Sequence, residues 1–226
     1  MSPSASSSAA SKKPRLPRVF VVRHGETEWS ISGQHTGRTD LPLTPNGENI
    51  IRALGKRIVG AGKILDPSHI QHVFVSPRSR AQKTFELLFE SVKQEERPSY
   101  ELEEGVREWE YGVCEGKKTA EIRETVKPDW DIWTDGCPEG ESADQMRDRC
   151  DAMIRKIVDM AECVFPFLAL KVDELTRMRL GWVCSAHHGK EETEGHHGDI
   201  LIVSHGHFSR CFMFVPSLPS LLPLPN

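Results

Sequence analysis

The sequence lacks any long apolar run. Its 226 residues contain no stretch close to the ~20 apolar residues that a helix needs to cross a bilayer. The first residues also lack the apolar core of a secretory signal peptide. These absences predict a protein with no membrane partner, located in the cytoplasm, with the nucleus as an alternative.

The chain also has few cysteines and no excess of positive charge. The six cysteines form no C-x-x-C pair, and six are too few for a disulfide scaffold in a chain of this length, so we expect reduced thiols. The formal net charge of −4 argues against a nucleic-acid partner, because the surface as a whole is not basic. Any bound phosphate must therefore meet a local cluster of cations. Nothing in the sequence indicates the oligomeric state.

Three segments differ in composition from the rest of the chain. Residues 1–17 are rich in serine and alanine and then basic, which predicts a disordered tail, with an organelle transit peptide as the alternative. Residues 163–198 show little periodicity, and residues 215–226 are too rich in proline for a regular helix. We predict one domain over residues 18–214, with an atypical insertion at 163–198 and an irregular tail at 215–226.

Strands and helices are predicted to alternate within that domain. Short apolar runs predict buried parallel strands at residues 18–22, 72–75 and 200–203, and residues 100–103 are a weaker candidate. Long helical patterns lie between them, for example over residues 141–162. The alternation predicts an α/β fold with a mostly parallel sheet.

Turn and cap signals place the first helices. Thr44 is a natural N-cap with Pro45 in the first helical position, and Ser76 and Pro77 predict the start of a second helix in the same way. Residues 23–44 read as a polar loop. The apolar face of the first helix is expected to comprise Ile50, Ile51, Leu54 and Ile58.

The most informative run is V-V-R-H-G-E-T-E-W, which follows the first predicted strand. A neutral imidazole at His24 can attack phosphorus and form a covalent phosphohistidine. Arg23 beside it can bind two phosphoryl oxygens at once. Both residues lie at the carboxyl end of a strand, where ligands gather in open α/β sheets. Alone, this run is a weak signal, because a structural histidine is the common alternative.

Three further groups strengthen the prediction of a phosphate pocket. Arg78 lies at the N-terminus of a predicted helix, whose dipole also favours an anion. His205 follows the last predicted strand and can donate a hydrogen bond to a phosphoryl oxygen. In R-E-W-E-Y-G, a partly buried glutamate with a raised pKa could protonate a leaving alkoxide, and Glu108 and Glu110 are both candidates.

These motifs together resemble the histidine phosphatase superfamily, whose fold is that of phosphoglycerate mutase. The resemblance covers residues 18–162 and 199–212 and rests on R-H-G-E-T-E-W, T-G-R-T-D-L-P-L-T-P-N-G, S-P-R-S-R-A-Q-K-T and S-H-G-H. It implies a three-layer α/β/α fold and no metal or cofactor. It further implies that His24 is the nucleophile, that Arg23, Arg78 and His205 bind phosphate with the backbone at Gly206, and that Glu108 donates the proton.

The spacing of the motifs favours a phosphatase within that superfamily. Only 23 residues separate Gly116 from Gly140, where the family's mutases carry a long insertion. The finer motifs resemble the sugar bisphosphatases of the superfamily, which implies a sugar phosphate partner such as sedoheptulose 1,7-bisphosphate. A broader phosphomonoesterase, a mutase-type activity and an inactive binding protein remain alternatives. The resemblance implies substrate contacts at Gln34, His35, Thr36, Tyr111 and Arg210, although Arg210 could be a simple surface arginine.

Two departures from the family pattern carry further expectations. The stretch 163–198 is longer than the family's connection, and the chain after Phe214 lacks the family's final helix and strand, so its C-terminal elements are incomplete. An exposed sheet edge and reduced stability are the expected consequences. Residues that could imitate a zinc site lie in the long stretch, but such spacings arise by chance, and we predict no metal. They are Cys184, His187, His188, His196 and His197.

Overall fold

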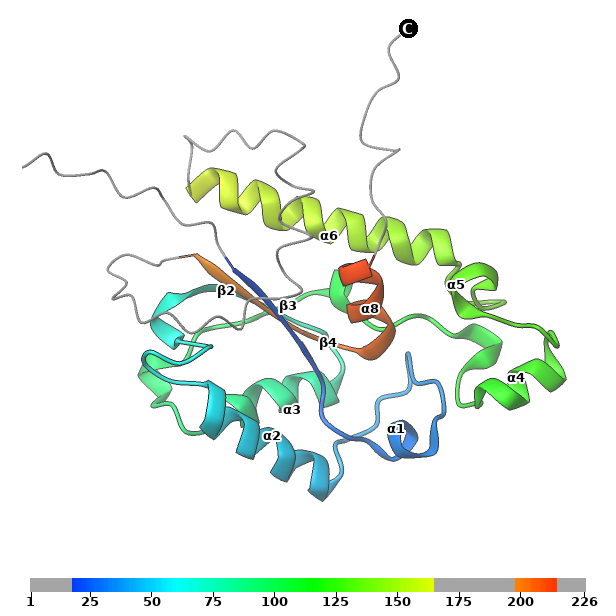
Figure 1. Ribbon diagram of the computed structural model, residues 1–226, viewed down its shortest axis with the longest axis horizontal. Helices are drawn as coiled ribbons and strands as arrows, with labels where there is room; N and C mark the ends of the chain where they lie inside the picture. The colour runs from blue at the N-terminus through cyan, green and yellow to red at the C-terminus, as the bar shows by residue number, and fades with distance from the viewer. Residues whose placement is uncertain (1–17, 165–197, 215–226) are drawn as a thin grey trace, which may run out of the picture.

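A four-stranded sheet lies between two layers of helices (Figure 1). The computed structural model describes residues 18–164 and 198–214. The predicted tails at 1–17 and 215–226 lie outside these residues, as does nearly all of the predicted insertion at 163–198 with its cysteine and histidines.

All pairings in the sheet are parallel. The strands are β1 (Val19–Arg23), β2 (Ile70–Val75), β3 (Glu101–Leu102) and β4 (Asp199–Ser204), in the order β1-β4-β2-β3. Each apolar run that predicted a strand forms one, so the predicted parallel α/β fold is confirmed. Because the strands are parallel, their carboxyl ends lie along the same edge of the sheet.

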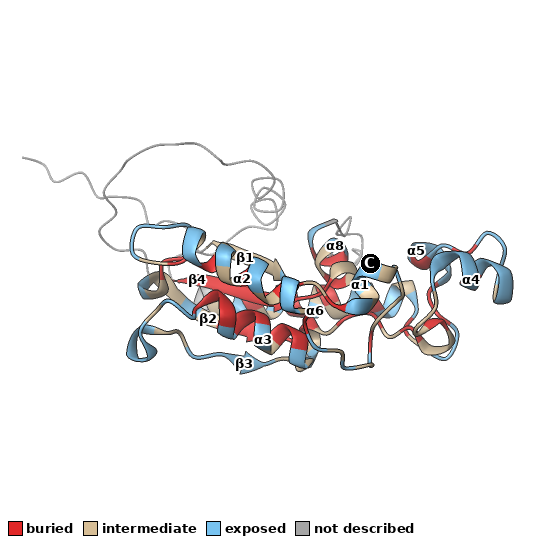
Figure 2. Ribbon diagram, turned by 90° about the horizontal axis from the view of Figure 1, so that it is seen from below, coloured by how far each residue is buried: buried red, intermediate tan, exposed pale blue. Residues whose placement is uncertain are grey.

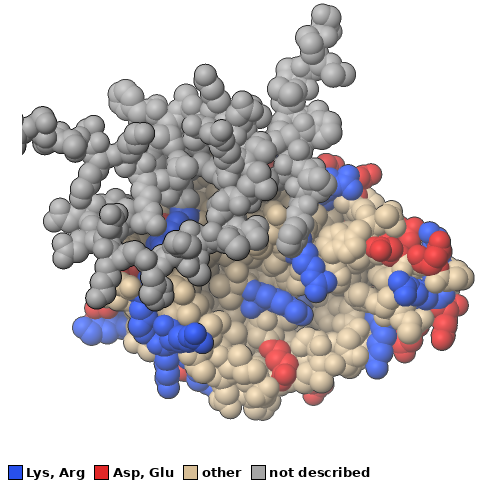
Figure 3. All heavy atoms as spheres, in the orientation of Figure 1, with Lys and Arg blue, Asp and Glu red and all other residues tan. Residues whose placement is uncertain are grey.

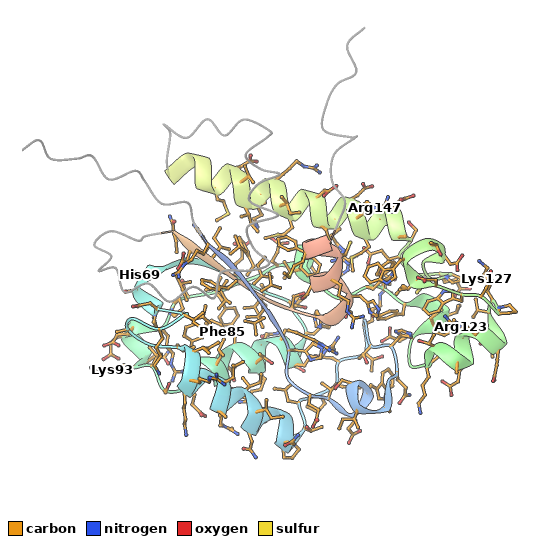
Figure 4. All side chains as sticks on the ribbon, in the orientation of Figure 1. His69, Phe85, Lys93, Arg123, Lys127 and Arg147 are labelled. Carbon is orange, nitrogen blue, oxygen red and sulfur yellow. The ribbon has the colours of Figure 1, made fainter. Side chains whose placement is uncertain are left out.

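Helices α2 (Pro45–Ile58) and α3 (Ser79–Leu88) cover one face of the sheet (Figure 1). Leu201 and Val203 of β4 belong to the core on this side, and both are fully buried. Phe85 of α3 packs in the same core, between its helix and the sheet (Figure 4). Each such buried side chain contributes about 1.5–3 kcal/mol to folding.

Helices α6 (Ala143–Val164) and α8 (Gly206–Phe214) cover the opposite face. Here Ile200 and Ile202 of β4 are buried against apolar side chains of both helices. Successive residues of β4 thus enter opposite cores, as the two-residue period of a strand requires. In Figure 2 the buried residues follow the strands and the inner side of α3. The predicted three-layer α/β/α arrangement is confirmed.

β1 lies at one edge of this sheet. Within the described residues it pairs with β4 alone, and its apolar residues from Val19 to Val22 are half-buried. Every residue of β4, in contrast, is buried. Two strands of similar sequence therefore differ in burial because one is central and the other is not.

The cap signals predicted one helix start correctly and one incorrectly. Thr44 caps α2, and Pro45 is its first residue, as expected. Helix α3 begins at Ser79 rather than at Pro77, and Ser76 does not cap it. The physical reason is that the Ser76 hydroxyl is buried and lies 2.6 Å from Nε2 of His205 instead.

Two smaller expectations are wrong. Ile50 is 52% exposed, because the helical period turns it toward solvent beside the buried Ile51. The predicted loop at 23–44 contains a short helix, α1 (Glu28–Ser32), which Thr27 caps.

The remaining helices are short. Helices α4 and α5 lie together at one end of the molecule, beyond α8 (Figures 1 and 2). They span Thr119–Thr125 and Ile132–Asp135, and single 3-10 turns span Pro67–His69, Gln94–Glu96, Glu104–Val106 and Gly112–Cys114. None of the helices in the described ranges is long and apolar enough to cross a membrane. Cys114, Cys137, Cys150 and Cys211 are free and buried.

Candidate active site

The carboxyl ends of β1, β2 and β4 bring two histidines together. His24 follows β1, Ser76 follows β2 and His205 follows β4. Backbone hydrogen bonds fix this arrangement, from His24 N to Ser204 O at 2.8 Å and from Ser76 N to Val203 O at 3.0 Å. The centroids of the two imidazole rings are 5.0 Å apart. The structure therefore places both histidines in one site, although 180 residues separate them along the chain.

The imidazole of His24 is held in one protonation state. Its Nδ1 lies 2.7 Å from the carbonyl oxygen of Gly25, and because a carbonyl only accepts, Nδ1 must carry the proton. Burial, together with the positive charges of Arg80 and Arg23, lowers the pKa of His24 to about 4. The ring is neutral near pH 7, and its lone pair lies on Nε2. No hydrogen bond from the described part of the chain occupies that atom.

His205 is fully buried and has a different partner. Its Nε2 meets the Ser76 hydroxyl, whereas its Nδ1 is buried without a hydrogen bond among the described residues. Burial, followed by the charges of His24 and Arg80, lowers its pKa well below the ordinary value. Because the Ser76 hydroxyl has no other acceptor within the described ranges, it donates to Nε2. The proton of the neutral ring is then on Nδ1.

The two predicted arginines contact different parts of the chain. Arg23 is exposed, and its guanidinium packs over Gly206, where an added Cβ would lie 3.4 Å from the Arg23 Cζ. Arg78 is half-buried and donates from Nε to the carbonyl of Gly37 at 3.2 Å. On the face shown in Figure 3, basic side chains lie near the centre of a mostly uncharged area.

Arg80 is a site residue that the sequence reasoning missed. Its side chain is completely buried, and its terminal nitrogens donate to the carbonyls of Thr36, Gly37 and Thr39. Its Nε has no partner among the described residues. Arg80 lowers the pKa of both His24 and His205, which shows that its charge acts on both rings. The available signal was the second arginine of S-P-R-S-R-A.

Glu108 is buried and fully hydrogen-bonded. Its carboxylate accepts from the backbone N–H groups of Trp109 (2.9 Å), His207 (3.1 Å) and Phe208 (2.9 Å), the last two at the start of α8. Burial by itself would raise the pKa of Glu108, but His207 and the three N–H donors together lower it. The expected raised pKa is therefore wrong for the free protein. The cause is the α8 N-terminus, which favours a negative charge.

The predicted substrate contacts at residues 34–36 divide into two groups. The Gln34 amide donates to the carbonyl of Gly116 at 2.7 Å and accepts from Ser32, and the Thr36 hydroxyl donates to the carbonyl of Gln34. Both side chains therefore already have hydrogen-bond partners, Thr36 within its own loop and Gln34 also in the segment that carries Gly116. The His35 ring lies 4.9 Å from the ring of Tyr111, and burial with the nearby His207 lowers its pKa to about 4.

The two remaining predicted substrate contacts, Tyr111 and Arg210, differ in burial. Tyr111 is buried, and its hydroxyl lies 2.7 Å from Nδ1 of His207. Burial raises the pKa of Tyr111 well above its ordinary value, so the hydroxyl stays neutral. Arg210 is exposed on α8. The pKa of His207 is lowered mainly by burial of its ring and to a smaller extent by the charge of Arg210. His207 was not among the predicted site residues, although it lies in the S-H-G-H motif.

Aromatic rings complete this side of the site. Trp133 lies 5.5 Å from His207 between ring centroids, and it is 40% exposed. Trp109 lies 5.5 Å from Trp133, and Trp130 lies 5.6 Å from His35. The described residues contain no group of three or more histidines, cysteines or carboxylates arranged to hold a metal ion.

Comparisons with known proteins agree with the fold and the motifs. The sequence model described as histidine phosphatase superfamily (branch 1) matches residues 19–163. The chain is 36% identical over 205 residues to a protein of Saccharomyces cerevisiae named sedoheptulose 1,7-bisphosphatase, covering 87% of this chain and 66% of that protein. It is 34% identical over 196 residues to a Mycobacterium tuberculosis protein named acid phosphatase, covering 87% of this chain and 73% of that protein.

Comparison with a solved structure also shows a shared fold. The structure of an open reading frame of Mycobacterium tuberculosis superposes with a TM-score of 0.62 at 31% identity, covering 88% of this chain and 78% of that chain. The fold is thus that of a phosphoglycerate mutase-like α/β enzyme. The chain belongs to the histidine phosphatase superfamily. The two curated relatives named above carry the names of phosphatases. The chain spans slightly less than two thirds of the length of the yeast relative.

Proposed function

We propose that this chain hydrolyses a sugar bisphosphate, with sedoheptulose 1,7-bisphosphate as the preferred substrate, through a phosphohistidine at His24 and without a metal. One observation carries the proposal. Among the described residues, two buried polar atoms, Nε of Arg80 and Nδ1 of His205, have no hydrogen-bond partner, and the ring of His205 lies 5.0 Å from that of His24. Buried donors of this kind are rarely left unpaired, and a bound phosphoryl group would satisfy both.

The first step transfers the phosphoryl group to the protein. The lone pair on Nε2 of His24 attacks phosphorus while the bond from phosphorus to the sugar oxygen breaks. The guanidinium groups of Arg23, Arg78 and Arg80 neutralise the phosphoryl oxygens, and Nδ1–H of His205 donates to one of them. The positive charge near His24 favours its neutral, nucleophilic form, because it opposes protonation of the ring.

Glu108 is proposed to supply the proton to the leaving sugar oxygen. In the free protein its carboxylate is ionised, because three N–H groups bind it. A bound phosphate dianion places like charge near this carboxylate and raises its pKa again, so that the carboxylate takes up a proton from solvent as substrate binds. After the sugar leaves, Glu108 accepts a proton from water, which attacks the phosphohistidine and releases inorganic phosphate.

The sugar specificity rests on the relatives and on Arg210. The yeast relative is named for sedoheptulose 1,7-bisphosphate and shares 36% identity with this chain. A bisphosphate has a second charged group outside the catalytic pocket. Arg210 is exposed on α8 and acts electrostatically on His207, whose backbone N–H binds Glu108, so a cation lies on the proton-donor side of the site.

The test is release of inorganic phosphate with a chelator present. Sedoheptulose 1,7-bisphosphate, fructose 1,6-bisphosphate and 3-phosphoglycerate are compared at matched concentrations. We expect the highest kcat/KM for the seven-carbon bisphosphate. Equal rates on all three would identify a broader phosphomonoesterase, conversion of phosphoglycerate to its isomer would identify a mutase, and no release from any of them would contradict the proposed hydrolysis.

A further inference from the structure

A buried ion pair lies beneath the loop that carries Glu108. Glu141 precedes α6, and Arg149 lies in the second turn of that helix; their side chains are 6% and 10% exposed. Arg149 donates from Nε and Nη2 to the two carboxylate oxygens of Glu141, both at 2.8 Å. Burying two charges costs several kcal/mol each, so a pair like this contributes little net stability. Its contacts with the loop suggest another role.

Arg149 binds the loop on the N-terminal side of Glu108. Its Nη1 donates to the carbonyls of Gly105 at 3.0 Å and Arg107 at 2.8 Å. Its Nη2 lies 3.4 Å from the carbonyl of Glu108 itself. One rigid guanidinium thus holds three carbonyl groups in a fixed arrangement.

Glu141 binds the loop on the C-terminal side of Glu108. Its backbone N–H donates to the carbonyl of Glu110 at 2.8 Å, and its carbonyl accepts from the indole N–H of Trp109 at 2.7 Å. Its carboxylate also accepts from the backbone N–H of Glu110 at 3.3 Å. The ion pair therefore holds the backbone on both sides of Glu108.

The same pair also contacts the second support of the Glu108 carboxylate. The guanidinium carbon of Arg149 lies 5.6 Å from the ring centroid of Phe208, in α8. The backbone N–H of Phe208 donates to Oε1 of Glu108. Loop and helix, which together fix the carboxylate, are thus both packed against one guanidinium.

We propose that Glu141 and Arg149 are positioning residues that hold Glu108 at the leaving oxygen. This inference rests on the proposed function. Within the described ranges neither side chain is hydrogen-bonded to the phosphate side of the site, which comprises His24, His205, Arg23, Arg78 and Arg80. Loss of the pair should therefore impair proton donation and leave phosphate binding and attack by His24 in place.

Two substrates separate these steps. A sugar phosphate releases an alkoxide that must be protonated, whereas p-nitrophenyl phosphate releases a stable phenolate that needs no proton. The value of kcat/KM reports only the steps through release of the alcohol, so the later attack of water does not enter. The variants are Arg149→Lys, which keeps the charge but loses the forked donor, and Glu141→Gln, which keeps the shape.

We expect both variants to lower kcat/KM for the sugar bisphosphate by about 100-fold, the loss typical of a catalytic group misplaced by about 1 Å. The value for p-nitrophenyl phosphate should stay nearly unchanged. The matched control is Arg147→Lys, on the exposed side of the same helix and paired with Asp144 (Figure 4). It should leave both values unchanged.

Several outcomes would overturn the inference. Equal losses on both substrates would show a merely structural pair, and no loss on either would show that Glu108 needs no such support. Thermal unfolding of each variant is measured alongside, and if Arg149→Lys does not fold, the isosteric Glu141→Gln decides. A wild-type protein inactive on both substrates would instead contradict the proposed function.

Discussion

His24 and His205 occupy equivalent positions in the chain, since each follows an apolar parallel strand and precedes a glycine. Their surroundings differ. Within the described residues β1 lies at the edge of the sheet and its apolar residues are half-buried, whereas β4 is central and buried throughout. His24 is half-buried and its Nδ1 faces a backbone carbonyl, whereas His205 is fully buried and its Nε2 faces the hydroxyl of Ser76.

The hydrogen-bond partner decides what each ring can do. A carbonyl accepts only, so His24 keeps its proton on Nδ1 and a lone pair on Nε2, as a nucleophile requires. The Ser76 hydroxyl has no other acceptor among the described residues, so it donates to Nε2 of His205. The ring proton is then on Nδ1, where a donor to an oxyanion needs it. In the proposed mechanism, the different hydrogen-bond partners of the two rings would therefore suit His24 to attack and His205 to donate.

Of the variants considered, His24→Ala should lose the most activity. Without the attacking nitrogen we expect kcat for the sugar bisphosphate to fall by at least about 10⁴-fold, because removal of a covalent nucleophile removes the reaction path. Steady-state phosphate release measures the loss, with circular dichroism to confirm folding. A folded, fully active variant would show that another group attacks phosphorus.

Replacing His205 by Ala should have a smaller effect. Loss of one donor to the developing oxyanion lowers kcat by about 10²–10³-fold. Ser76→Ala is the matched variant, because it leaves the ring in place and removes only the partner that fixes its proton. Its loss should be smaller than that of His205→Ala. A larger loss in Ser76→Ala would contradict the assigned proton position.

The strands themselves provide a comparison in stability. Ile202→Ala in β4 removes a fully buried side chain and should lower the free energy of unfolding by about 2–5 kcal/mol. Val21→Ala in β1 removes a smaller, half-buried side chain, and we expect about 1 kcal/mol. Urea unfolding measures both values. Equal losses would mean that β1 is as well covered as β4.

The pKa of His24 gives a pH dependence of stability. Burial, then the charge of Arg80, lowers this pKa to about 4, against 6.5 for an ordinary histidine. Between these pH values the unfolded chain binds a proton that the folded protein does not, so acidification from pH 6.5 toward 4 favours unfolding. Between pH 7 and pH 5 the free energy of unfolding should fall in both proteins. We expect the fall to be about 2 kcal/mol smaller in His24→Asn than in the wild type. Parallel pH dependences would exclude a lowered pKa at His24.

Much of the fold could be predicted, because its signals are local. Each buried strand is a short β-branched run, and the ends of parallel strands must meet, so the proximity of His24 and His205 followed from the sequence. The proton affinity of Glu108 did not follow, because it depends on N–H groups of α8 about 100 residues away. The roles of Ser76 and Arg80 were hidden because α3 begins two residues later than its cap signals indicate.

The most direct test of the account is to trap the phosphorylated protein during turnover. Wild-type protein is mixed with the sugar bisphosphate, denatured at alkaline pH, where phosphohistidine survives, and mapped by mass spectrometry. The account predicts phosphate on His24, and none in His24→Ala. Phosphate on His205, or turnover with no phosphorylated histidine, would contradict the roles assigned to the two rings.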